Sequence, residues 1–537
     1  PPPPPPPPPP PSSFSPPPPP SRHPLWSRGR GDVYKRQVSV NLEQADIKSL
    51  QQWMCDGELT SVELCQFYLE RIETYDRQGP VLNSVIELNP DALEQAEQFD
   101  LERSKKHFRG PLHGIPILIK DNIDTADRMA TSAGSLALEH SYAKKDAFLV
   151  RKLRDAGAVL LGKTNLSEWS NFRSNRSISG WSSRGGQTRN PYDPLRNPCG
   201  SSSGSAVAVA AGFCAAAIGT ETDGSILGPS SRNGVVGLKP NVGRISRQGL
   251  IPISHSQDTP GPLTRKVADA LLLLEVLKGK DPQDPATSLA PGKSEIPEFH
   301  IQSDRLEGIR IGVARNLYHG DSRMEQLLED AVRALIDLGS VVEDSLYLDN
   351  TMLLKMPELE VLLHEFKLGI NAYLGNLEDY PEHLSPPKSL KELIAFNQAH
   401  QEQVMPFFAQ ELFEKAERRG DLSSEIYLES LKECRRLSRQ QGIDAFMQKH
   451  GLDAFIAPTS GPAWLTDSVN GDPVSIETSF TPSAVAGYPG ISVPLGFISG
   501  LPVGLSFYGG AWSERMLLRC AHAFENATKA QIAPAIN

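Results

Sequence analysis

The fold is decided by residues 200–211, which read GSSSGSAVAVAA. A run of Gly and Ser alone usually indicates a flexible linker. Here the run continues without a break into small apolar residues, which a linker would not do. Small side chains let a helix pack closely inside a protein, so the sequence predicts a buried helix that starts among the serines. The free N–H groups and the dipole of that helix start would then lie near Ser201 and Ser202.

Two further segments carry polar groups next to apolar or glycine-rich sequence. Residues 114–122, GIPILIKDN, predict a short buried strand that ends at Lys120. Taken alone, such a lysine indicates only where a strand meets water. Residues 219–226, GTETDGSI, place glycines around Ser225 and predict a tight turn that exposes its hydroxyl among backbone N–H groups. Taken alone, this segment could equally be an ordinary turn.

Strand and helix signals alternate through the chain after residue 38. Residues 60–63 read TSVE, a capping box that predicts a helix start, and a second box occupies residues 389–392. The alternation predicts an α/β fold, with one large domain over residues 38–537, a sheet core covered by helices on both faces and a helical cover region at about 355–449. Strand-like runs lie at 115–119, 158–161, 309–313, 454–457, 491–493 and 503–507. Residues 323–338 predict a helix closed by Gly339, and residues 341–342 begin a further strand.

Composition limits the class of protein. The chain has 537 residues, of which 39% are hydrophobic, enough to bury a sizeable core. A net charge of −10 leaves no basic excess for nucleic acid or an anionic membrane surface. No apolar run reaches the about 18 residues of a membrane span. The six Cys show no C-x-x-C spacing, so we expect no metal site and no disulfide framework, and reduced thiols favour a cytoplasmic location.

Residues 1–37 differ from the rest of the chain. They hold 17 of the 46 Pro, and a Pro run adopts polyproline II because it cannot donate backbone hydrogen bonds. One interpretation is a ligand for Pro-binding modules. However, residues 31–37, GDVYKRQ, resemble translated library-adapter sequence. We therefore expect an extraneous, disordered head, and a native protein that begins near Val38.

Jointly, the three chemical segments resemble the amidase signature family, and the match runs through most of residues 45–530. Further matching stretches are residues 234–240, 257–262, 486–489 and 500–505. The resemblance implies an amidase signature fold with a mixed sheet. It also implies a catalytic lysine at Lys120, a bridging serine in a cis peptide at Ser201, a nucleophile at Ser225, an accessory hydroxyl at Ser202, and oxyanion-hole amides at Thr222, Asp223, Gly224 and Ser225.

The implied mechanism has a physical basis. A serine hydroxyl is a weak nucleophile that needs a base. A neutral lysine can serve without any histidine, provided that burial lowers its pKa from about 10.4. Lys120 would take a proton from Ser201, which takes one from Ser225, while backbone N–H groups hold the oxyanion. The resemblance implies no cofactor for this hydrolysis of a carboxamide through an acyl-serine.

Residues 200–204 also fit G-x-S-x-G, the nucleophile elbow of α/β-hydrolases. In that reading Ser202 is the nucleophile of an esterase, with His255, His364 or His522 as its base. The elbow should follow an apolar strand, but residues 190–198, NPYDPLRNP, predict a loop. The sequence context therefore favours Ser225.

A third alternative is a glutamine-hydrolysing, amidotransferase-type subunit. Many family members have an arginine where this chain has Leu227, so Glu221 would lack its usual partner unless Arg232 or Arg244 replaces it. Residues 220–226 and 256–262 look more like the peptide amidase branch, whose members act alone on peptide C-terminal amides or small amides. We expect such a substrate and a monomer or homodimer. Cys199, where the family often has glycine, is interpreted as a small buried thiol rather than a catalytic one.

Overall fold

The computed structural model describes residues 41–291, 304–318, 321–378, 385–473 and 478–536. The chain from Asn41 onward forms one compact unit. The Pro-rich head expected at residues 1–37 lies outside the described residues.

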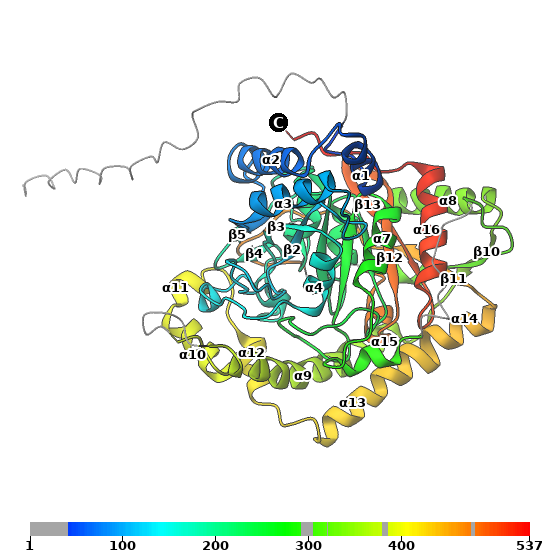
Figure 1. Ribbon diagram of the computed structural model, residues 1–537. Coiled ribbons are helices and arrows are strands. Elements are labelled where there is room, and N and C mark those ends of the chain that lie inside the picture. The colour runs from blue at the N-terminus through cyan, green and yellow to red at the C-terminus, as the bar shows by residue number, and fades with distance from the viewer. Residues whose placement is uncertain (1–40, 292–303, 319–320, 379–384, 474–477, 537) are drawn as a thin grey trace, which may run out of the picture. The chain divides into compact units, whose positions relative to one another are not determined.

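An 11-stranded mixed sheet is the centre of this unit (Figure 1). In spatial order its strands are β1 (Val85–Leu88), β3 (Val159–Thr164), β2 (Pro116–Lys120), β6 (Ala216–Glu221), β8 (Thr259–Thr264), β7 (Val236–Lys239), β12 (Gly490–Ile498), β13 (Leu501–Tyr508), β11 (Ala454–Pro458), β9 (Arg310–Ala314) and β10 (Val341–Leu346). β2 runs parallel to both β3 and β6, and β9 runs parallel to β10 and β11. A separate ribbon pairs β4 (Trp181–Ser182) with β5 (Gly186–Gln187).

Helices flank the sheet, which confirms the predicted α/β class. They are α1 (Ile47–Asp56), α2 (Ser61–Arg71), α3 (Ala92–Ser104), α4 (Phe148–Asp155), α5 (Ser203–Ala210), α6 (Leu227–Arg232), α7 (Val267–Leu277), α8 (Ser322–Asp337), α9 (Lys355–Gly375), α10 (Leu390–Ala399), α11 (Gln401–Val404), α12 (Glu411–Glu417), α13 (Glu425–Arg435), α14 (Asp444–His450), α15 (Thr481–Ala486) and α16 (Glu514–Thr528). Helices α9 to α14 occupy the predicted cover region, and Figure 1 shows α9 and α13 together along the lower side.

Local sequence explains where several helices begin. Thr60 and Glu63 form the predicted capping box at the start of α2. At the second box, Ser389 accepts a hydrogen bond from the Glu392 amide, but the Glu392 carboxylate accepts from the amide of Lys388 instead of closing the box. The capping box is therefore confirmed for α2 and half formed for α10.

All seven predicted strand runs lie on strands of the sheet, and the predicted helix at 323–338 is α8. The sequence analysis missed β4 and β5 of the separate ribbon and, in the large sheet, β1, β6, β7 and β8. Three of these four strands, β6, β8 and β7, lie side by side in the middle of the sheet.

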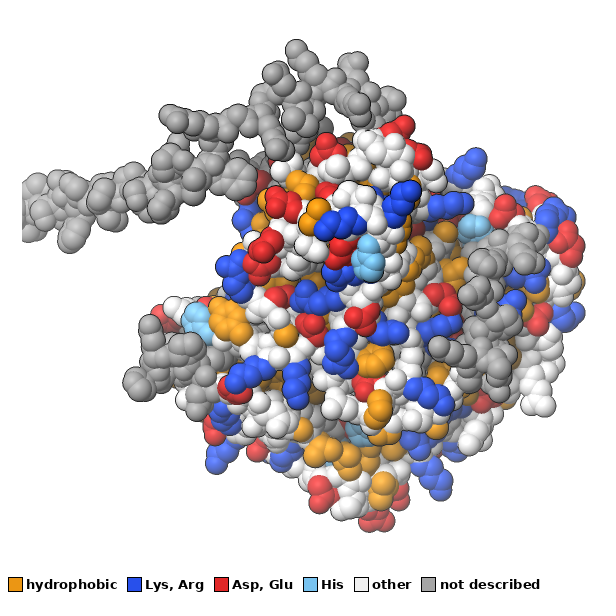
Figure 2. Space-filling model, viewed as in Figure 1, with side chains coloured by type: hydrophobic (Ala, Val, Ile, Leu, Met, Phe, Trp, Pro, Cys, Tyr) orange, Lys and Arg blue, Asp and Glu red, His pale blue; other side chains and the backbone are white. Residues whose placement is uncertain are grey.

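The surface agrees with the composition. Acidic and basic side chains are interspersed over the face shown in Figure 2. Within the described part of the chain, every helix is too short or too polar to cross a bilayer.

Candidate active site

Strand pairing places Lys120 at the candidate site. β2 is buried along its whole length, and Lys120 is its last residue. Because β6 is its parallel neighbour, the carboxyl ends of the two strands meet at the same edge. There Lys120 Nζ donates to the Thr220 hydroxyl at 2.9 Å and to the Thr220 carbonyl at 3.3 Å. The lysine therefore does not mark where a strand meets water.

The surroundings of Lys120 favour its neutral form. The side chain is fully buried, and this burial lowers the pKa of Lys120 to about 7, against a smaller opposite effect of Asp258 and Glu221. Among the described residues, no carboxylate forms an ion pair with it. A substantial fraction of Lys120 is therefore an uncharged amine near neutral pH.

Ser201 lies beside that amine. The Gly200–Ser201 peptide is cis, and the Lys120 Nζ to Ser201 Oγ distance is 2.8 Å. Both side chains are buried. The structure thus brings together two residues that are 81 positions apart in the sequence.

Ser202 connects this segment to the backbone around Ser225. Its hydroxyl donates to the Thr220 carbonyl at 3.1 Å and accepts from the Thr220 amide at 3.2 Å. Its own amide donates to the carbonyl of Ser225 at 3.1 Å. The Ser202 hydroxyl is thereby engaged by backbone groups, and in the described chain it has no histidine partner.

The three histidines that the esterase alternative requires have other contacts. His364 Nδ1 is 2.9 Å from the carbonyl of Glu360, and His522 Nε2 is 3.1 Å from an Asn526 nitrogen. His255 is half exposed and lies 3.3 Å from the Glu365 carboxylate. Ser202 is also preceded by a loop rather than a strand, as the sequence indicated. The geometry gives no support to a Ser202–His pair.

Ser225 occupies a turn between β6 and α6. It is 8% exposed, and the part of the chain that the structure describes gives its hydroxyl no hydrogen-bond partner. The turn depends on Gly224, which has a φ of 77°, and a Cβ there would lie 2.1 Å from the Phe480 ring. The predicted tight turn is therefore present, and the strand–turn–helix arrangement of a nucleophile surrounds Ser225 rather than Ser202.

The turn also carries free backbone donors. In the described structure, the amides of Thr222, Asp223 and Ser225 donate to no acceptor. The Gly224 amide instead donates a hydrogen bond to the Glu221 carboxylate, which acts to lower the pKa of Glu221 against the effect of burial. Unpaired amides on successive residues form a concave group of donors suited to an anionic oxygen.

The positive charge that stabilises the Glu221 carboxylate is that of Lys239, rather than that of Arg232 or Arg244. One oxygen of Glu221 accepts from the Leu227 amide at 2.9 Å and from the preceding amide at 2.6 Å. Burial raises the pKa of Glu221, and the charge of Lys239 opposes that rise. Neither arginine named in the sequence analysis acts on Glu221, because each contacts other groups. Lys239, at the end of β7, lies in the matching stretch 234–240, but the sequence gave no signal that it faces Glu221.

The proximity of two acids, the half-buried Asp223 and the buried Glu358, was also missed. The Asp223 carboxylate accepts from Thr481 at 2.9 Å, and burial raises the pKa of Asp223 to about 7. Burial and the charge of Asp223 together raise the pKa of Glu358. Gln257 donates to Glu358 at 2.9 Å and to the Thr222 carbonyl at 3.3 Å. Gln257 thus links α9 to the turn that carries Ser225. The sequence analysis singled out the stretches that hold Asp223 and Gln257, but gave no signal that Glu358 approaches them.

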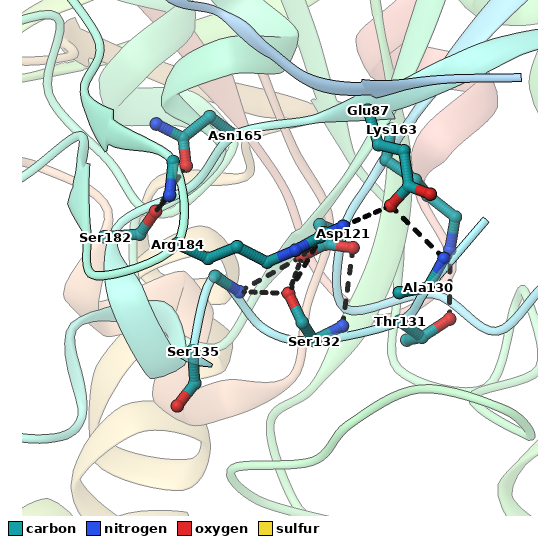
Figure 3. Close-up of polar contacts among 12 residues, drawn as sticks. Glu87, Asp121, Ala130, Thr131, Ser132, Ser135, Lys163, Asn165, Ser182 and Arg184 are labelled. Atoms are coloured by element: carbon teal, nitrogen blue, oxygen red, sulfur yellow. Dashed lines mark hydrogen bonds and ion pairs between the residues drawn. The ribbon is translucent and has the colours of Figure 1, made fainter. Parts of the chain in front are cut away.

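A second polar network fixes the residue after Lys120 (Figure 3). The buried Asp121 carboxylate accepts from the Ser132 hydroxyl and from the Gly134 amide, the latter at 3.1 Å. Arg184 lies 3.6 Å from Asp121 and also pairs with Glu87 on β1. These contacts hold the backbone at the end of β2 and so fix the point from which the Lys120 side chain extends.

Comparisons with known proteins identify the family of the chain. Residues 63–518 match the amidase family. A "probable amidase" of Arabidopsis thaliana is 40% identical over 517 residues, covering 94% of each chain. The native peptide amidase of Stenotrophomonas maltophilia is 50% identical, covers 92% of this chain and 99% of its own, and superposes with a TM-score of 0.86. Peptide amidase PAM in complex with the competitive inhibitor chymostatin is 51% identical, with a TM-score of 0.87 and coverage of 91% and 99%. The chain therefore belongs to the amidase signature family and is an amidase-family enzyme.

Proposed function

We propose that this enzyme hydrolyses the C-terminal carboxamide of peptides, or small amides of similar shape, to a carboxylate and ammonia. The observation that carries the proposal is the buried contact of 2.8 Å between Lys120 Nζ and Ser201 Oγ at a lysine whose pKa is lowered to about 7. The likeness to peptide amidases at 50% and 51% identity supports the substrate class.

The proposed reaction uses Ser225 as the nucleophile. Neutral Lys120 takes the proton of Ser201, Ser201 takes that of Ser225, and Ser225 Oγ attacks the amide carbon. The unpaired amides of the turn hold the oxyanion. The same relay returns a proton to the leaving nitrogen as the C–N bond breaks. Water then attacks the acyl-serine, gives its proton to the relay and releases the acid.

The direct test is ammonia release from a blocked peptide amide by the purified chain, without ATP or a second protein. We expect turnover, and the products should be the free peptide acid and ammonia in equal amounts. Ammonia from glutamine alone, appearing only with a partner subunit, would favour the glutamine-hydrolysing alternative and contradict the proposal.

Variants test the roles within the site. Lys120→Ala and Ser225→Ala should each abolish turnover, because each removes a group that the chemistry uses. The protein should still fold, because neither residue is part of the hydrophobic core. Circular dichroism would check folding. A serine-directed phosphonate should label Ser225 and not Ser202, as peptide mapping would show. Full activity in either variant, or labelling of Ser202, would refute these roles.

A further inference from the structure

Arg232, the last residue of α6, is a buried cation that has no acidic partner in the described part of the chain. It is 1% exposed, and within the described residues no carboxylate pairs with it. Its Nη1 donates to Cys199 Sγ at 3.3 Å, and its guanidinium lies 4.7 Å from the centroid of the Trp464 ring. Its Nε is buried and has no hydrogen-bond partner in the described structure.

This situation differs from that of the other buried arginines. Arg173 pairs with Glu168, and Arg244 makes two hydrogen bonds to Glu514. Arg265 donates to three backbone carbonyls. Burying a charge is costly unless a partner compensates it. Among the buried arginines of the described chain, Arg232 is thus the one whose positive charge is least compensated.

The neighbouring groups do not neutralise it. Burial raises the pKa of the Cys199 thiol, so Cys199 remains uncharged beside Arg232. Asp472 acts on Arg232 only from a distance, and its two oxygens accept from the Ser179 amide at 3.0 and 3.2 Å. Within the described residues, no anionic group is therefore in direct contact with Arg232.

Helix geometry places the guanidinium near the nucleophile. The Gly228 amide donates to the Gly224 carbonyl at 2.8 Å, so the first turn of α6 follows directly on the turn that carries Ser225. Gly228 and Arg232 then lie four residues apart on one face of α6. A Cβ on Gly228 would lie 3.8 Å from Arg232 Nη1. The guanidinium therefore lies beside Gly228, four residues after the glycine that precedes Ser225.

Two aromatic rings border the same face. Phe480 lies against both glycines, because a Cβ would be 2.1 Å from its ring at Gly224 and 3.6 Å at Gly228. Phe480 and Trp464 are both partly exposed, whereas Arg232 beneath Trp464 is not. The two rings therefore border the segment 224–232, which carries both Ser225 and Arg232.

We propose that Arg232 is a specificity-determining residue that binds a carboxylate on the acyl part of the amide substrate. The proposal rests on the proposed function and narrows its substrate class to amides with an acidic group near the scissile carbonyl. The planar guanidinium presents paired N–H donors that match a carboxylate. The α-amide of a C-terminal glutamate has the required chemistry, since its side-chain carboxylate is a few carbon atoms from the scissile carbonyl.

The test compares kcat/KM for N-acetylglutamate α-amide, N-acetylnorvaline amide and N-acetyllysine amide. A charge-assisted hydrogen bond should favour the glutamate compound over norvaline by about tenfold, and the lysine compound should be the poorest. Arg232→Gln should bring the glutamate-to-norvaline ratio close to unity through a higher KM for the glutamate amide. Arg232→Lys should retain part of the preference.

Arg244→Gln is the matched control, because Arg244 is also buried and lies 4.8 Å from a tryptophan ring, Trp512. It should lower stability and leave the substrate ratio unchanged. If Arg232→Gln does not fold, inhibition of the unaltered enzyme decides: N-acetylglutamate should inhibit about tenfold more strongly than N-acetylnorvaline.

The outcomes separate this inference from the proposed function. Equal kcat/KM for the glutamate and norvaline amides, or an equal loss for both in Arg232→Gln, would overturn the carboxylate site while amide hydrolysis stands. No ammonia from any of the three amides would overturn the proposed function itself.

Discussion

Lys120 is the residue whose protonation controls the proposed chemistry. Its amine must be neutral to accept a proton from Ser201, and burial lowers its pKa to about 7. Below this pH most of the amine is protonated and inactive. We therefore expect kcat/KM to rise about tenfold per pH unit up to pH 7 and to level off above it. Initial rates between pH 5 and 9 would measure this.

Asp223 complicates that profile, because burial raises its pKa to about 7 as well. Asp223→Asn removes this titration and should leave the rise in kcat/KM in place. Lys120→Arg should be inactive at every pH, because arginine stays charged. A pH-independent rate between pH 5 and 9 would contradict the assignment of Lys120 as the base.

Gly224 allows a second prediction at the residue scale. Its φ of 77° and the 2.1 Å approach of Phe480 leave no space for a side chain. Gly224→Ala should displace the amides that would hold the oxyanion and lower kcat by about 100-fold or more. The double variant Gly224→Ala/Phe480→Ala relieves the contact but keeps the positive φ. If Gly224→Ala has normal kcat, the turn is not part of the site.

Sequence reasoning reached Lys120, Ser201 and Ser225 through family resemblance, because each segment alone also had an ordinary interpretation. It could not find Lys239 as the cation that acts on Glu221. That interaction depends on β7, a strand that the sequence did not predict. Likewise, Arg244 pairs with Glu514, which lies 270 residues away, and no local sequence pattern indicates that contact.

Among the elements, α5 shows how closely the site segment is packed. Every residue of α5 is buried, and a Cβ on Gly204 would lie 2.2 Å from the Ser84 carbonyl and 2.5 Å from that of Asn165. Backbone atoms cannot move aside as a flexible side chain can. Gly204→Ala should therefore lower the free energy of unfolding by about 3 kcal/mol or more, measured by urea denaturation.

Gly375, at the end of α9, is the matched control because a Cβ there has its nearest neighbour at 3.8 Å. Gly375→Ala should leave stability unchanged or raise it slightly, since alanine favours a helix. Equal effects of the two substitutions would mean that α5 is not tightly packed.

Strand β8 shows why part of the fold could not be predicted. Its sequence is TPGPLT, and proline normally argues against a central strand. β8 pairs with β7 only through Leu263 and Thr264. Pro260 and Pro262, which have no N–H to donate, therefore lie on the part of β8 that makes no hydrogen bonds to β7. β6 was also hard to predict, because its glycine and polar residues resemble those of a turn. Apolar runs such as that of β2 were predictable because burial on both faces requires them.

For the whole molecule, Glu358 links global stability to pH. Its folded pKa is raised by burial and by Asp223, so between the unfolded pKa and the folded one the native state binds more protons. Stability should therefore fall as pH rises through this window, by up to about 1.4 kcal/mol per unit. Glu358→Gln removes this loss and should become more stable than the unaltered chain as pH increases.

Urea denaturation at several pH values between 5 and 9 would test this. Glu402, exposed on α11, supplies the control: Glu402→Gln should differ from the unaltered chain by a constant amount at all pH values. If the difference in unfolding free energy between Glu358→Gln and the unaltered chain does not change with pH, the Glu358 carboxyl ionises as an exposed carboxyl does, and the prediction is wrong.

The order of the strands has one more consequence. β1, β3, β2, β6, β8 and β7 come from the first half of the chain, the other five from the second, and the halves meet where β7 pairs with β12. Lys120, Ser201 and Ser225 all belong to the first half. Dividing the chain after Ala290 into two separately encoded polypeptides should thus give fragments that associate through the β7–β12 pairing when they are co-expressed. Such a split enzyme would regain amide hydrolysis only when both fragments are present.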